Sequence, residues 1–263
     1  DVYKRQDQHV ASAMNPGGGQ HGMTLLELLI TAVLTAMLML GLVHFASAAG
    51  ASNLLMENQA FLQDQLRVTR RVLAPAIMQA GFKPGPWNDS FSLQALGDET
   101  ADDYSRGNDR LVVREWSDRN CFDNLNPAKS SAGQPAFHIR ESAFDVSRDR
   151  HLTRDCRYGP TLSDLVVQIR RQGLVPGVES FQLLFGEDSS GNGNVDHWVR
   201  AQAWEDGESV TGIRVGLLLA GEDPVTEPAA GMFSVLDETI TTRADGKLRM
   251  AADFVFSIRG KGR

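Results

Sequence analysis

One acidic residue within a long apolar segment constrains this chain more than any other feature. From Met23 to Met56 the sequence contains no Lys, Arg or Asp, and Glu27 is the only residue with a formal charge. An apolar helix of about 20 residues can cross the hydrocarbon core of a bilayer. A carboxylate inside such a helix costs about 2.5–3.5 kcal/mol on insertion scales, so we expect it to have a partner or a function.

The position of the acid resembles the processing signal of type IV prepilins. In that family a short leader ends in Gly, and the mature chain begins with an apolar helix whose fifth residue is Glu. Gly22, Met23 and Glu27 stand at these positions. The resemblance implies that prepilin peptidase cuts between Gly22 and Met23 and that Met23 becomes the N-methylated terminus. It also implies an assembly role for Glu27, which neutralises the terminal amine of a neighbouring subunit.

Two other interpretations of the N-terminal segment stay open. It could be an ordinary membrane anchor with an incidental acid. It could also be a secretory signal, since residues 46–48 form an A-x-A pattern after an apolar stretch. The mature chain would then begin at Ala49 rather than at Met23. We interpret residues 1–22 as a leader that starts at Met14, preceded by a non-native extension.

The helical pattern continues beyond the apolar segment. Apolar residues recur at steps of three and four as far as Ala80, and Gly81 and Pro84 then favour an end to the helix. One helix over residues 23–80 would be about 87 Å long. We expect residues 23–49 to form a transmembrane and assembly helix and residues 50–81 to be amphipathic. Pro75 should kink the last turns.

Residues 82–263 show the pattern of a β-rich domain. Short β-prone runs alternate there with clusters of Gly, Pro, Asn and Asp. The predicted strands cover residues 111–116, 135–139, 165–170, 178–185, 198–204, 212–220 and 254–258. The expected fold is α+β, with a long N-terminal helix packed on an antiparallel sheet, which resembles the type IV pilin fold.

Three segments resemble the PilW family of minor pilins: residues 78–82, 109–113 and 173–186, the last of which contains Gly-Val-Glu-Ser. The resemblance implies a minor pilin that joins other minor pilins and the major pilin in a priming or tip complex of the type IV pilus. It also implies a single-pass inner-membrane protein with a periplasmic domain, present in the pilus after assembly. A minor pseudopilin of type II secretion is the alternative within this class.

The chain has two cysteines, Cys121 and Cys156. In a domain outside the cytoplasm such a pair predicts a disulfide, which would close a loop of about 36 residues and contribute about 3–4 kcal/mol in the chain-entropy model. Two free thiols or a metal pair are the alternatives. No CxxC spacing or nearby His cluster supports a metal.

A polar loop after the fourth predicted strand resembles part of an EF-hand calcium loop. Its oxygen donors at alternate positions are Asp188, Ser190, Asn192, the Asn194 carbonyl and Asp196. An EF-hand carries a bidentate acid at its twelfth position, where this chain has Val199, so Glu187 or a distant acid would have to replace it. The loop is predicted either to bind calcium or to form a polar hairpin turn.

Composition and motifs argue against other classes of function. The net charge of −7 gives no basic field for nucleic acid. The sequence contains no HExxH, GxSxG, P-loop or dinucleotide-binding motif, so we expect no enzyme activity and no required cofactor. The rival from another class is a membrane-tethered or secreted periplasmic enzyme, or a calcium-dependent binding module.

Overall fold

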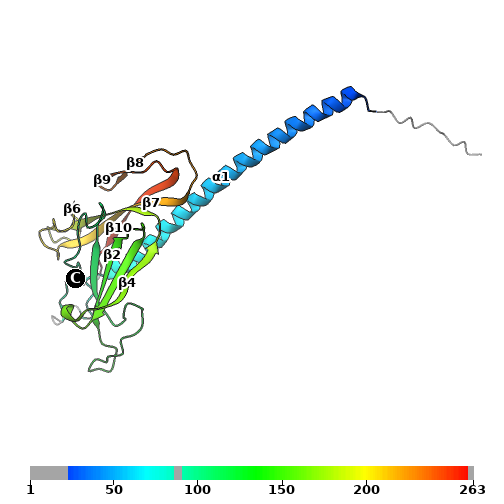
Figure 1. Cartoon of the computed structure of the whole chain (residues 1–263). Coiled ribbons are helices and arrows are strands. Elements are labelled where there is room, and N and C mark those ends of the chain that lie inside the picture. Colours follow the sequence, from blue (N-terminus) through cyan, green and yellow to red (C-terminus); the bar gives the residue numbers. More distant parts are fainter. Residues whose placement is uncertain (1–22, 86–90, 260–263) are drawn as a thin grey trace, which may run out of the picture. The chain divides into compact units, whose positions relative to one another are not determined.

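The computed structural model describes residues 23–85 and 91–259. By internal contacts the chain divides into two units, residues 1–50 and 51–263. One helix, α1 (Leu25–Gln79), begins in the first unit and ends in the second (Figure 1). It confirms the predicted long N-terminal helix.

The ends of α1 follow from local chemistry. At its start the Thr24 hydroxyl accepts a hydrogen bond from the Glu27 backbone N–H at 3.3 Å, as a helix cap does. At its end Gly81 adopts a left-handed backbone with φ of 74°, and its N–H donates to the Arg114 carbonyl at 2.7 Å. Pro75 lies inside the helix and does not end it.

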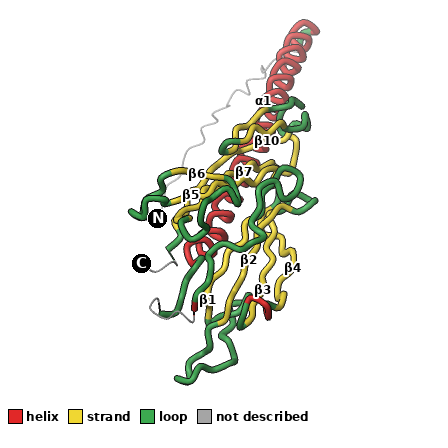
Figure 2. Tube along the Cα trace, turned by 90° about the vertical axis from the view of Figure 1, so that its left-hand side faces the viewer, coloured by secondary structure: helices red, strands yellow, loops and turns green. Residues whose placement is uncertain are grey.

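The strands form two antiparallel four-stranded sheets and a separate hairpin, whereas the sequence predicted one sheet (Figures 1 and 2). The first sheet contains, in order, β1 (Leu111–Ser117), β2 (His138–Val146), β3 (Leu152–Gly159) and β4 (Val166–Val175). The second contains β10 (Lys247–Ser257), β7 (Val210–Pro224), β5 (Val178–Glu187) and β6 (His197–Val199). The hairpin pairs β8 (Met232–Val235) with β9 (Glu238–Thr241), and a short 3₁₀ helix, η2 (Leu162–Asp164), precedes β4.

Several strand predictions need correction. The strand predicted at 198–204 ends at Val199, because the chain turns there and the Ala203 N–H bonds to the Arg200 carbonyl at 3.1 Å. The strand predicted at 135–139 begins only at His138 and runs on to Val146. β3, β8 and β9 were not predicted. β3 in particular carries three charged residues, which weakens the apolar signal of a strand.

The second half of α1 shares one hydrophobic core with both sheets. Leu62, Leu73 and Ile77 of α1 are fully buried, and they belong to the same cluster as Phe144 of β2 and Phe181 of β5. The other buried clusters among the described residues are small, so the helix is the element that holds the two sheets in one layered arrangement. This confirms the predicted α+β class with a helix packed on antiparallel strands.

The chain crosses from the first sheet to the second through a tight turn between β4 and β5. Gly177 in this turn has a φ of 74°, and an added Cβ would lie 2.4 Å from the Ala220 carbonyl oxygen. The Gly177 carbonyl accepts the Ala220 N–H at 2.8 Å. Glycine is required here both for its backbone conformation and for the close approach of β7.

A buried carboxylate also joins the two sheets. Asp109, just before β1, accepts the backbone N–H of Leu183 in β5 at 2.7 Å, and its own N–H donates to the Phe181 carbonyl at 2.9 Å. The neighbouring Asn108 side chain accepts the Phe181 N–H at 2.7 Å. Burial raises the pKa of Asp109 to about 6, although the two backbone hydrogen bonds to its carboxylate act in the opposite direction.

We expect Asp109 to make folding stability depend on pH. Because its folded pKa lies above the ordinary value, the folded state holds a proton that the unfolded state has lost between pH 4 and pH 6. The stabilisation present below about pH 4 therefore declines as the pH rises through about 6, by about 1–3 kcal/mol. Urea unfolding at half-unit steps from pH 4 to 7 measures this, and Asp109→Asn should flatten the curve. An unchanged slope in that variant would contradict the assignment.

Candidate functional site

The first part of α1 exposes a continuous apolar surface with one acid. All residues from Leu25 to Gly50 are exposed, including Leu25 at 82% and Phe45 at 74%. Within the described ranges, α1 is the one helix long and apolar enough to cross a membrane. Glu27 lies in its first turn, where the positive end of the helix dipole favours an acid. Met23 precedes the helix, and Gly22 lies outside the described residues.

Cys121 and Cys156 form a disulfide, as predicted. Cys156 lies in β3, and Cys121 lies in the long connection between β1 and β2, so the bond ties this connection to the first sheet. Both cysteines are buried and pack with Tyr158 and Ile169. The free-thiol and metal-pair alternatives are therefore excluded for this pair.

The predicted calcium loop joins β5 to β6 and closes on itself. The Asp188 carboxylate accepts the Asn192 N–H at 3.0 Å and the Gly193 N–H at 2.6 Å. The Asp196 carboxylate accepts the Ser190 N–H at 2.8 Å, and the Asn192 side chain accepts the Asn194 N–H at 2.8 Å. These contacts match a polar hairpin turn held by Asx-type hydrogen bonds. Among the described residues, no group of three or more His, Cys, Asp or Glu is placed to hold a metal ion.

Glu187 does not supply the missing twelfth-position ligand. Its carboxylate accepts the Ser209 hydroxyl at 2.7 Å and the Glu205 N–H at 3.1 Å, and it lies 3.1 Å from Nε2 of His197. The hydrogen bond from Ser209 is the main cause that lowers the pKa of Glu187. This side chain stabilises the turn before β7 through these hydrogen bonds. Sequence spacing alone could not predict these contacts.

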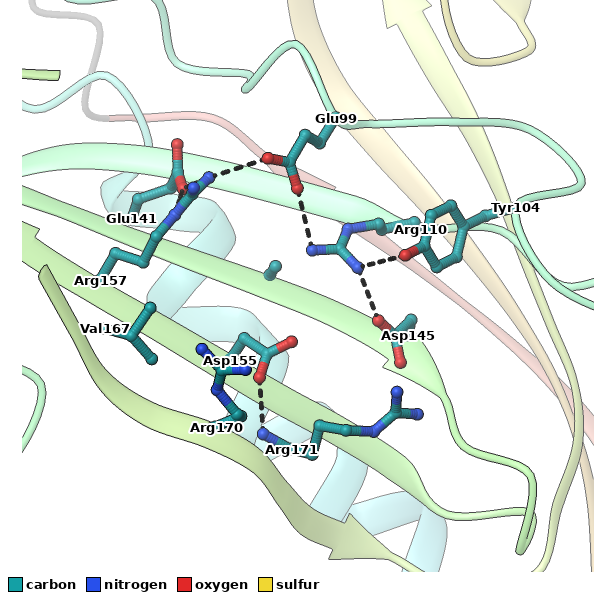
Figure 3. A pocket seen from close by; sticks show the side chains of 11 residues that line it. Glu99, Tyr104, Arg110, Glu141, Asp145, Asp155, Arg157, Val167, Arg170 and Arg171 are labelled. Atoms are coloured by element: carbon teal, nitrogen blue, oxygen red, sulfur yellow. Dashed lines mark hydrogen bonds and ion pairs between the residues drawn. The ribbon is translucent and has the colours of Figure 1, made fainter. Parts of the chain in front are cut away.

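A charged cavity of 270 Å³ lies on one face of the first sheet (Figure 3). Glu141, Ala143 and Asp145 of β2 line it, whereas the alternate β2 residues Ser142 and Phe144 line a second cavity together with Val72, Pro75, Ala76 and Gln79 of α1. Because strand residues alternate between faces, the charged cavity lies on the face away from α1.

Ion pairs neutralise most of the charges around this cavity. Arg110 contacts Asp145 at 2.9 Å and Glu99 at 3.1 Å, and Arg157 pairs with Glu99 at 3.1 Å and with Glu141. Tyr104 accepts a further hydrogen bond from Arg110 at 2.9 Å. None of these residues was predicted as a site. The sequence signal that could have indicated this cavity is the charged residues at alternate positions of β2 and β3.

Two family models match separate parts of the chain. The model of the prokaryotic N-terminal methylation motif matches residues 18–43, which include Gly22, Met23 and Glu27. The model described as Type IV Pilus-assembly protein W matches residues 160–260, from just before β4 to just after β10. Both matches support a PilW-type minor pilin, as the sequence predicted. They likewise support a role in type IV pilus assembly.

The type IV-like pilin TTHA1219 from Thermus thermophilus has a TM-score of 0.48 and 16% sequence identity, over 77% of this chain and 97% of that chain. A search of curated proteins finds no match.

Removal of the disulfide should destabilise this minor pilin. The paired variant Cys121→Ser with Cys156→Ser frees a loop of about 36 residues in the unfolded chain, so the free energy of unfolding should fall by about 3–4 kcal/mol. Urea denaturation of the variant and of the oxidised wild type measures the difference. The wild type reduced with dithiothreitol is the control and should match the variant. A difference close to zero would contradict this account.

Proposed function

We propose that prepilin peptidase cleaves this minor pilin between Gly22 and Met23 and that the processed chain joins other minor pilins and the major pilin in a priming or tip complex. The observation that carries the proposal is the exposed, apolar first part of α1. Glu27, five residues after Gly22, is the only charged residue between Met23 and Met56. The role is structural: residues 23–49 serve first as an anchor in the inner membrane and then as an interface between subunits.

The physical reason for Glu27 is charge compensation in apolar surroundings. Cleavage creates an ammonium group at Met23, and Glu27 is the only formal charge between that residue and Met56. An ion pair removed from water is favourable only when both members are present, and loss of one member leaves an uncompensated charge. A neighbouring subunit's terminal amine can therefore pair with Glu27 only when the two helices have the correct register.

The disulfide supports a periplasmic location for the domain. A disulfide between Cys121 and Cys156 fits an oxidising environment such as the periplasm. We place residues 50–263 there, with residues 50–81 as the amphipathic half of the helix and residues 82–263 as the β-rich domain. The amphipathic half supports this division, since Leu62, Leu73 and Ile77 are buried in the core of the domain.

Substitution of Glu27 should separate membrane insertion from assembly. Glu27→Ala removes the only charged side chain between Met23 and Met56, so insertion should be unchanged, while incorporation should fall about tenfold or more because the partner amine is left unpaired. Co-purification with other minor pilins from host membranes measures incorporation. Glu57→Ala, which removes an exposed acid farther along α1, is the matched control. Equal incorporation of all three proteins would contradict the ion-pair role.

Calcium binding by residues 188–196 stays a prediction of its own. The two carboxylates, Asp188 and Asp196, each lie within 3.4 Å of the Ser190 hydroxyl, so the loop brings three of the predicted donors together. Isothermal titration with calcium chloride should give binding that Asp188→Asn and Asp196→Asn each weaken about tenfold. If the titration of the wild-type protein gives no heat of binding, the loop is a polar turn and the calcium prediction is wrong.

A further inference from the structure

Two adjacent arginines of β4 point into the same cavity because the strand is bulged. Neighbouring residues of a regular strand lie on opposite faces. Here Arg154 pairs with Gln172 and the next pair is Cys156 with Ile169, so Arg170 and Arg171 lie between two pairs and face Asp155. Both arginines line the charged cavity (Figure 3). A bulge of this kind redirects a side chain.

The bulge holds an unfavourable backbone conformation in place. Arg171 has a φ of 46°, in the left-handed region that residues other than Gly rarely adopt. The Asp155 carboxylate accepts the Arg171 backbone N–H at 2.6 Å and thereby fixes this conformation. Backbone of this kind persists only where surrounding contacts hold it, and it concentrates at functional sites.

The two guanidinium groups are the cations of this cavity that lack a partner. Arg110 and Arg157 are each paired with two acids. Within the part of the chain that the structure describes, no hydrogen bond or ion pair involves the side chains of Arg170 and Arg171. A free guanidinium group matches a carboxylate, which arginine binds with two parallel hydrogen bonds.

β4 is also an open edge of its sheet. It pairs with β3 on one side, and among the described residues no backbone hydrogen bond covers its other side. The opposite edge is covered, since the Gly97 N–H donates to the Val112 carbonyl of β1 at 2.9 Å. Val166 and Val167 of β4 are exposed. Such an edge is a template for an added strand.

We propose that β4 and this cavity bind an extended acidic segment of a partner protein. The segment lies beside β4 as an additional strand, and a Glu or Asp side chain enters the cavity and pairs with Arg170 and Arg171. A residue on an added strand lies directly beside the same-face residues of its neighbour, within reach of a long side chain such as that of arginine.

Two observations favour a polypeptide over a nucleic acid. The cavity's volume of 270 Å³ lies at the lower limit of ligand pockets and suits a single side chain rather than a continuous chain of phosphates. The open strand edge adds main-chain hydrogen bonds that only a polypeptide can complete.

The test uses the full chain in detergent micelles and a fluorescein-labelled peptide with alternating Val and Glu, seven residues or so in length. Fluorescence anisotropy should show saturable binding that salt weakens. The paired variant Arg170→Gln with Arg171→Asn should bind about tenfold more weakly, since Asn tolerates the left-handed backbone but carries no charge. Arg170→Gln alone leaves the bulge residue in place and should weaken binding about threefold.

Matched controls make the outcome decisive. Arg243→Gln removes an exposed arginine that does not line the cavity and should bind like the wild type. A peptide with Gln in place of Glu should bind about tenfold more weakly than the acidic peptide. The proposal is overturned if the acidic peptide fails to bind, if the arginine variants bind it equally, or if a single-stranded oligonucleotide binds more tightly through the same arginines. None of these results depends on whether the chain enters a pilus.

Discussion

The constraint on which this protein depends is an apolar helical surface that its own domain does not cover. Every residue from Leu25 to Gly50 is exposed, and most of the large side chains among them are aliphatic. An exposed apolar surface of this extent requires lipid or other protein around it. Lipid tails and neighbouring helices are similar in polarity, so the same surface can serve in a membrane and then in an assembly. In the proposed function, Glu27 is the group that distinguishes between them, because it needs an opposite charge.

The folded domain relies on a different balance, in which buried polar groups are paired rather than avoided. Asp109 and Asn108 accept backbone N–H groups of β5 and so connect the two sheets. Glu141, which is 2% exposed, accepts hydrogen bonds from both Arg114 at 2.7 Å and Arg157. Buried charges of this type are tolerated only when each has its partner. The first sheet can therefore carry charged residues on both faces. Arg170 and Arg171 at its open edge differ, because they are exposed and their side chains have no partner among the described residues.

The sequence was informative wherever a single local pattern decides the structure. The three- and four-residue spacing predicted α1 to within a residue of its end, and the two cysteines predicted the disulfide. β1 and β5 were predicted well because apolar runs bounded by turn residues mark them. The methylation-motif match then covers Gly22, Met23 and Glu27, the residues selected from the spacing of the acid.

Features that depend on long-range pairing were not predictable. β3 carries Arg154, Asp155 and Arg157, and only its pairing with β2 and β4 makes a strand of it. The division into two sheets follows from which strands pair, which no single segment reveals. The charged cavity combines residues from three strands, β2, β3 and β4, and from the segment before β1. The role of Glu187 depends on Ser209 and His197, which lie 22 and 10 positions away.

Proteolysis must release the terminal amine of Met23 before Glu27, an acid in an apolar segment, has a partner. Mass spectrometry of the intact protein, isolated from the membranes and pili of its host, tests this most directly. The account predicts a mature chain that begins at Met23 and carries one methyl group on its terminal nitrogen. A chain that keeps the residues before Met23, or one that begins at Ala49, would contradict it.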